Sequence, residues 1–191
     1  EYTKQILNLN GISNKVSLKV KEQYEENPYP RWVMAKEKKD RKYIELISDS
    51  IGPNKLPQEY LTQETKIRNV LIAGCGTGNH PISIAIDDYD VKIDALDISL
   101  SSLSYGKRMA ELLNVNNINW IHGDILNLED FNKKYDAIEC CGVLHHMESP
   151  KKGFDALSNS LNENGLLKIA VYSRAFRNKL KAAKEFLKLK N

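Results

Sequence analysis

The stretch "VLIAGCGTG", residues 70–78, is a short apolar run that leads into three glycines at alternate positions. The apolar run is typical of a buried strand, and "HPISIAID" at residues 80–87 is typical of a helix, with Pro81 in its first turn. Glycines allow a tight turn and let a ligand approach the backbone closely. A helix N-terminus also offers unpaired N–H groups to an anion. The stretch therefore predicts a strand–turn–helix unit that binds a ligand at the turn; a tight turn without a ligand is the alternative.

Strand and helix patterns alternate along the rest of the chain. Strand-like segments occupy residues 69–74, 91–97, 118–124, 135–142 and 165–173, and helical patterns occupy residues 80–87, 100–115 and 150–161. Such alternation requires crossover connections and gives a parallel sheet covered on both faces. We therefore predict an α/β fold, a Rossmann-like doubly wound parallel sheet, in residues 67–191.

Composition excludes several classes of protein. The 191 residues suit one ordinary domain, and 41% hydrophobic with 28% charged residues is typical of a globular chain. A net charge of +3 gives no argument for nucleic acid or membrane binding, and no apolar run approaches the roughly 20 residues of a membrane span. Cys75, Cys140 and Cys141 are badly spaced for disulfides, which favours reduced thiols and a cytoplasmic location. No Cys/His spacing matches a zinc site, so we expect no metal.

Two acids follow predicted strands at places that suit a nucleoside. Asp97 ends the second strand, where a carboxylate can accept from both ribose hydroxyls. Asp124 ends the third strand and can accept from the amine of adenine, with Ile98 and Ile125 on either side of the ring. Capping of the next helix is compatible with the role of Asp97, although Ser99 can cap instead; Asp124 taken alone is an ordinary loop acid.

The glycine spacing separates classes of nucleotide. A dinucleotide fingerprint is G-x-G-x-x-G, whereas here Gly74, Gly76 and Gly78 come first and Asn79 follows. A P-loop needs lysine after its last glycine, and His80 gives none. The spacing therefore disfavours a nicotinamide-dependent oxidoreductase.

The successive motifs "VLIAGCGTGNHPISIA", "IDALDISLSSLSYGKRMAELL", "IHGDILNL", "YDAIECCGVLHHMESP" and "GLLKIAVYS" resemble those of class I S-adenosylmethionine-dependent methyltransferases over residues 69–173. The resemblance implies that S-adenosylmethionine is the cofactor, with its methionine part on the glycine turn, its ribose on Asp97 and its adenine on Asp124. The expected cofactor-binding residues in this core are Gly74, Cys75, Gly76, Thr77, Gly78, Asp97, Ile98, Asp124, Ile125 and Gly142.

The resemblance also implies a strand order of 3-2-1-4-5, with the last two strands of the family absent. We therefore expect the core of residues 67–191 to be C-terminally truncated, or completed by another segment. Ile72 stands where the family often has an acid that helps to bind the cofactor's ammonium group. The missing strands and Ile72 leave open a non-catalytic S-adenosylmethionine-binding or scaffold module.

Residues 1–66 are predicted to form an N-terminal helical lid. Ile12, Val16, Val20 and Tyr24 recur at intervals of four, which indicates a helix over 12–26, and a second helix is expected over 38–50. Between them, "YEENPYPRW" at 24–32 resembles a segment that precedes the methyltransferase unit in bacterial tetratricopeptide-repeat fusion proteins. A tetratricopeptide-repeat region or another segment of the same polypeptide is therefore an expected partner.

The aromatic segment has two possible roles. As a lid, Tyr29 and Trp32 exclude water from the cofactor crevice and Arg31 meets the cofactor carboxylate. As a plug, Tyr29 and Trp32 only fix the N-terminal helices onto the sheet.

"GVLHHM", residues 142–147, places His145 and His146 just beyond the fourth strand. One of them is a candidate general base, while packing of the loop or contact with the cofactor is the alternative. No Asp-Pro-Pro-Tyr or Asn-Pro-Pro-Tyr follows this strand, which disfavours DNA bases and amide nitrogens as acceptors. Residues 173–191 predict a solvated amphipathic helix, or a basic rim for an acidic acceptor. The predicted function is methyl transfer to an unidentified small molecule or protein side chain.

Overall fold

The computed structural model describes residues 2–9, 11–35, 37–52, 55–57, 60 and 67–173. It contains an all-parallel six-stranded sheet in the order β1-β4-β3-β2-β5-β6. The strands are β1 (Leu7–Asn8), β2 (Asn69–Ala73), β3 (Lys92–Asp97), β4 (Ile118–His122), β5 (Tyr135–Cys141) and β6 (Leu161–Ala170). The predicted α/β fold is confirmed, and the five predicted strands stand in the predicted order. The sixth, β1, was not predicted and lies at the sheet edge beside β4.

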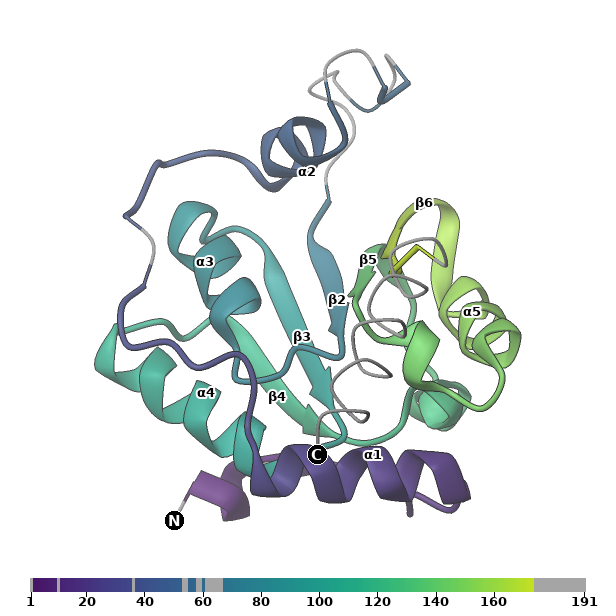
Figure 1. Cartoon of the computed structure of the whole chain (residues 1–191). Helices are drawn as coiled ribbons and strands as arrows, with labels where there is room; N and C mark the ends of the chain where they lie inside the picture. The colour runs from purple at the N-terminus through teal and green to yellow at the C-terminus, as the bar shows by residue number, and fades with distance from the viewer. Residues whose placement is uncertain are drawn as a thin grey trace, which may run out of the picture.

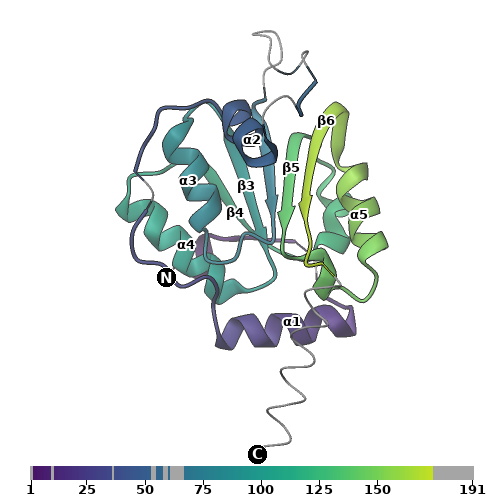
Figure 2. The ribbon, with the colours of Figure 1, turned by 45° about the horizontal axis from the view of Figure 1, so that its top comes forward.

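Helices cover both faces of this sheet. The helices are α1 (Lys15–Glu26), α2 (Tyr43–Ile51), α3 (Asn79–Asp87), α4 (Leu100–Leu112) and α5 (Pro150–Asn159), with 3₁₀ turns η1 (Tyr2–Gln5), η3 (Ile125–Phe131) and η4 (Leu144–His146). One buried cluster joins the sheet to α2, α3 and α4, and a second joins it to η3, η4 and α5. Figures 1 and 2 show these two groups of helices on opposite sides of the sheet.

The central strand β2 explains why both faces must be covered. Val70 and Ile72 belong to the first cluster, whereas Leu71 and Ala73 belong to the second, and all four are buried. Side chains alternate between the faces of a strand, so a continuous apolar run needs an apolar partner on each side. The run therefore places β2 in the centre of the sheet, with its glycine turn at the carboxyl edge.

Helix α1 lies across the carboxyl ends of the central strands (Figure 1). At one end of the helix, the Glu25 carboxylate accepts hydrogen bonds from the backbone N–H groups of Leu100 (2.7 Å) and Ser101 (2.8 Å), at the start of α4. At the other end, Asn14 caps α1 and donates from Nδ2 to Glu148 at 2.8 Å, after η4. Helix α1 is thus attached on both sides of the sheet edge that it crosses.

Two predictions involve residues outside the described ones. Residue 66, on the N-terminal side of the predicted domain boundary, is not described, and neither is the tail after Ser173 in which a helix is expected. Within the part of the chain that is described, no helix combines the length and the apolar character that a membrane span needs.

Candidate active site

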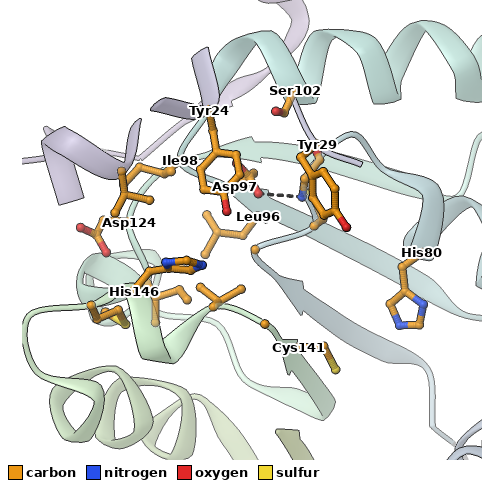
Figure 3. Close-up of a pocket in the computed structure, with 18 of the residues that line it drawn as sticks. Tyr24, Tyr29, His80, Leu96, Asp97, Ile98, Ser102, Asp124, Cys141 and His146 are labelled. Atoms are coloured by element: carbon orange, nitrogen blue, oxygen red, sulfur yellow. Dashed lines mark hydrogen bonds between the residues drawn. The ribbon is translucent and has the colours of Figure 1, made fainter. Parts of the chain in front are cut away.

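A cavity of about 350 Å³ lies at the carboxyl edge of the sheet, beneath α1. The turns that follow β2, β3, β4 and β5 contribute to its walls (Figure 3). Ten residues predicted from the sequence line it: Tyr29, Gly74, Cys75, Gly76, Asp97, Ile98, Asp124, Ile125, Gly142 and His146. These residues come from separate elements. They meet because parallel strands place their carboxyl ends at the same edge of the sheet.

The glycine turn is shaped by close neighbours. Gly76 has a left-handed backbone with φ of +55°, and a Cβ at this position would lie 2.3 Å from the Tyr29 carbonyl oxygen. Thr77 N–H donates to the same oxygen at 3.1 Å. Only glycine therefore fits between the turn and the segment that crosses it.

Asp97 connects the glycine turn to the start of α4. Its Oδ2 accepts from Gly76 N–H at 2.7 Å and its Oδ1 accepts from Ser99 N–H at 2.9 Å. Burial raises the pKa of Asp97, while these backbone hydrogen bonds act in the opposite direction. Ser99 caps α4, since its side chain accepts from Ser102 N–H. Asp97 is therefore available to a ligand through the remaining acceptor positions of its carboxylate.

Asp124 occupies the corresponding place after β4. Its side chain is buried, accepts from Leu126 N–H at 3.0 Å and caps η3. Figure 3 shows Asp124 and Ile98 on one side of the cavity and His80 and Cys141 on the other. The cavity thus has one end with Asp124, Ile98 and His146 and, across the glycine turn, another end with His80.

Thr77 and Trp32 contact each other outside the cavity lining. Trp32 Nε1 donates to Oγ1 of Thr77 at 3.1 Å and to its carbonyl oxygen at 3.2 Å, and Thr77 Oγ1 donates to the Pro30 carbonyl. The Trp32 ring meets the Tyr105 ring edge-on, with 5.8 Å between centroids. Thr77 therefore fixes the aromatic segment to the glycine turn, while Tyr29 and Pro30 line the cavity.

Three further predicted residues lie outside the lining. Arg31 is exposed. Gly78 is the N-cap of α3 and packs under Trp120, since a Cβ there would lie 2.5 Å from the ring. The His145 ring lies between the rings of His146 and Tyr172 and is tilted to both, with centroids 4.2 and 4.5 Å away.

Other lining residues escaped the sequence analysis: among them are Tyr24, Asn79, His80, Cys141 and Tyr172. Asn79 and His80 directly follow the glycine turn, which is a position that could have indicated them. In the sequence, Tyr24 is recognisable only as part of the apolar stripe of a helix, because periodicity does not distinguish a core side chain from one that faces a ligand.

The contacts of Trp32 favour the role of a plug, in which the ring fixes the N-terminal segment onto the sheet and does not cover the cofactor. We expect Trp32→Ala to lower the free energy of unfolding by roughly 3 kcal/mol, near the low end for a buried aromatic because the ring is only partly buried. Denaturant unfolding measures this loss, and Val33→Ala is the matched control because Val33 is 83% exposed. An unchanged stability together with faster release of S-adenosylhomocysteine would instead identify Trp32 as part of a lid.

The residues of the cavity fit S-adenosylmethionine. The two buried acids can accept from a ribose and an adenine, Ile98 and Ile125 offer apolar surface, and the glycine turn leaves room for close approach of a ligand.

Known proteins resemble the chain over this region. Residues 71–167 match the family described as "Methyltransferase domain". An uncharacterized protein of Synechococcus sp. is 34% identical over 123 residues, which are 63% of this chain and 29% of the relative. The probable (S)-tetrahydroprotoberberine N-methyltransferase 2 of Papaver bracteatum is 30% identical over 100 residues, or 52% of this chain and 28% of the relative. The chain thus spans less than a third of the length of these relatives.

Solved structures share the fold. The plantazolicin methyltransferase BpumL in complex with S-adenosylhomocysteine superposes with a TM-score of 0.54 and 23% identity, covering 62% of this chain and 44% of that one. Coclaurine N-methyltransferase, bound to N-methylheliamine and S-adenosylhomocysteine, gives a TM-score of 0.51 and 23% identity, covering 59% and 33%.

Proposed function

The chain belongs to the methyltransferase domain family, as the class I S-adenosylmethionine-dependent motif series predicted, and on that premise we propose that it methylates an acceptor held at the open side of the cavity. The observation that supports this most strongly is the pair of buried carboxylates, Asp97 and Asp124, on one cavity with the glycine turn. A dinucleotide site would instead need the third glycine one residue later.

The proposed placement of the cofactor follows the chemistry of the lining. The ribose hydroxyls donate to Asp97, and the adenine lies near Asp124 between the side chains of Ile98 and Ile125. The methionine part passes over the turn that begins at Gly74. This arrangement uses each carboxylate as an acceptor and leaves the imidazole of His80 at the end that faces the methionine group.

When bound, S-adenosylmethionine supplies a methyl group on a sulfonium, which is ready for in-line displacement. The chain mainly positions the reactants, and α1 with Tyr24 shields them from water. His146 lines the cavity and meets the Tyr24 ring edge-on at 6.2 Å, so it is the proposed base for a hydroxyl or ammonium acceptor. His145 packs against His146 at a tilt and positions its ring.

The acceptor is proposed to be a small molecule or a protein side chain. A tetratricopeptide-repeat region or another segment of the same polypeptide remains the proposed partner, supported by the sequence "YEENPYPRW". The three cysteines are free thiols, which supports a cytoplasmic location as part of the same proposal.

Thermal unfolding with ligands tests the proposed function. S-adenosylhomocysteine at about 100 times its Kd stabilises a native state by about 2.7 kcal/mol, which for a chain of this size corresponds to a rise in Tm of roughly 5–10 °C. We expect this rise with S-adenosylhomocysteine and none with NAD at the same concentration. Stabilisation by NAD alone would overturn the proposal.

A further inference from the structure

His80 is an imidazole that joins the cavity to a buried acid. It is the second residue of α3, directly after the glycine turn, and its side chain is 47% exposed. It lines the cavity opposite Asp124 (Figure 3). It also lines a neighbouring cavity of about 270 Å³, together with Glu139 and Lys168.

Glu139 is the acid that contacts His80. Its side chain lies on β5 and is 3% exposed. Its Oε1 accepts from the Tyr43 hydroxyl at 2.9 Å, and its Oε2 contacts Lys168 Nζ at 2.7 Å and His80 Nε2 at 3.1 Å. Burial alone would raise the pKa of Glu139, but His80 and Lys168 outweigh it and bring the pKa to about 2.

The ionised carboxylate decides how the imidazole is oriented. A carboxylate only accepts hydrogen bonds, so Nε2 of His80 carries the proton in this contact. An imidazole that is protonated at both ring nitrogens can donate from Nδ1–H to a second acceptor. The other charged groups nearby are Lys168 on the same carboxylate oxygen, and Arg41 paired with Asp49 beside the second cavity.

The cofactor carries a carboxylate of its own, on the methionine part. If the ribose lies on Asp97, this carboxylate reaches the end of the cavity where α3 begins. None of the described side chains that line the cavity is a lysine or an arginine, and Arg31 lies outside it. The imidazole of His80 and the N-terminus of α3 are the groups at this end that favour an anion.

We propose that His80, oriented by Glu139, binds the carboxylate of the cofactor's methionine group. This inference rests on the proposed function, since it assumes S-adenosylmethionine in the cavity. It replaces Arg31, the residue expected from the sequence, with one whose ring is fixed by a buried acid. It also separates the roles of the imidazoles, because His146 is left to face the acceptor.

Two ligands that differ in the methionine part test the proposal by calorimetry. S-adenosylhomocysteine has the carboxylate, whereas 5′-methylthioadenosine keeps the nucleoside and sulfur and lacks the amino acid. We expect His80→Ala to weaken the binding of S-adenosylhomocysteine at least about tenfold, which is the scale of one charge-assisted hydrogen bond. Binding of 5′-methylthioadenosine should change less than twofold, and this ligand also reports that the variant is folded.

Two further variants sharpen the result. Glu139→Gln keeps the shape of the side chain and removes its charge. It should therefore weaken the binding of S-adenosylhomocysteine but not the binding of 5′-methylthioadenosine. His80→Lys places a cation at this position and should recover part of the affinity that His80→Ala loses. Equal losses for both ligands, or no loss for either, would overturn the role of His80. If neither ligand binds the native protein, the proposed function fails as well.

A base role for His80 gives a different pattern. A general base acts on the acceptor, so its removal would leave the affinity for S-adenosylhomocysteine unchanged and lower only the rate of methyl transfer. That outcome would also overturn carboxylate binding by His80.

Discussion

Gly76→Ala should lower the free energy of unfolding by roughly 2–5 kcal/mol and remove most binding of S-adenosylhomocysteine. A left-handed backbone costs a residue with a Cβ about 1–2 kcal/mol, and overpacking adds about 1–3 kcal/mol. The new Cβ would lie 2.3 Å from the Tyr29 carbonyl oxygen. Relief of that contact must displace either Tyr29 or the turn, which breaks the hydrogen bond from Thr77 N–H and the one from Gly76 N–H to Asp97.

Gly52→Ala is the matched control for this substitution. Gly52 also has a positive φ, of +96°, but the nearest atom to its Cβ would be the flexible end of Lys55 at 3.7 Å. The control therefore carries a backbone strain that is at least as large, since φ of +96° with ψ of 158° is essentially restricted to glycine, but it has no steric overlap and lies away from the cavity. Denaturant unfolding and a ligand titration of both variants give the comparison. If Gly76→Ala keeps the stability and the affinity of the native protein, the turn does not approach Tyr29 as closely as the structure shows.

Asp97→Ala should weaken the binding of S-adenosylhomocysteine by about 1.5–3 kcal/mol, which is the scale of hydrogen bonds to a charged group. That corresponds to roughly 10- to 150-fold in Kd. The variant also loses the acceptor for two backbone N–H groups, so some stability is lost as well. Asp94→Ala controls for this, because Asp94 is a buried acid on the same strand, bonded to Lys133 and Tyr135 and absent from the cavity lining. Equal affinity in Asp97→Ala and the native protein would remove Asp97 from the site.

The pH dependence of binding gives a second check on Asp97. Burial raises the pKa of this carboxyl in the free protein, and ribose hydroxyls donate to its ionised form. Binding must then weaken as the pH falls through that raised pKa, since protons compete with the ligand. The same raised pKa means that Asp97 favours folding at low pH, and that this contribution is lost as the pH rises through it. Asp97→Ala should remove the acid limb of the binding profile.

The order of the five main strands was predictable because it follows from a motif series that spans them all. The edge strand β1 was not predictable, since it is a pair of residues, Leu7 and Asn8, defined only by its pairing with β4. Two residues carry no periodicity. The strand β6 begins at Leu161, where the sequence indicated the end of a helix, because its first residue pairs with Tyr135 across a register shift.

Apart from Tyr29, the cavity residues that the sequence predicts are tied to strand ends. Asp97 and Asp124 follow strands, so the fold alone fixes which edge of the sheet they reach. Arg31 and Trp32 belong to an irregular segment, where neither period 2 nor period 3.6 tells which side chain faces inward. The tertiary contacts determine which way the Trp32 side chain faces. Its indole donates to Thr77 and packs against Tyr105 of α4.

The network around Glu139 shows a different limit. Tyr43, His80 and Lys168 converge on this acid from α2, α3 and β6, and their separations along the chain are long. No local spacing links them, so a single sequence gives no indication that they meet. The pairing is visible only once the sheet and the covering helices are assembled.

A structure determined with S-adenosylhomocysteine tests the central claim most directly. We predict the ligand in the cavity beneath α1, with its ribose hydroxyls within hydrogen-bond distance of Asp97 and its adenine between Ile98 and Ile125. The ligand bound elsewhere on the molecule, or bound with its ribose away from Asp97, would contradict the account.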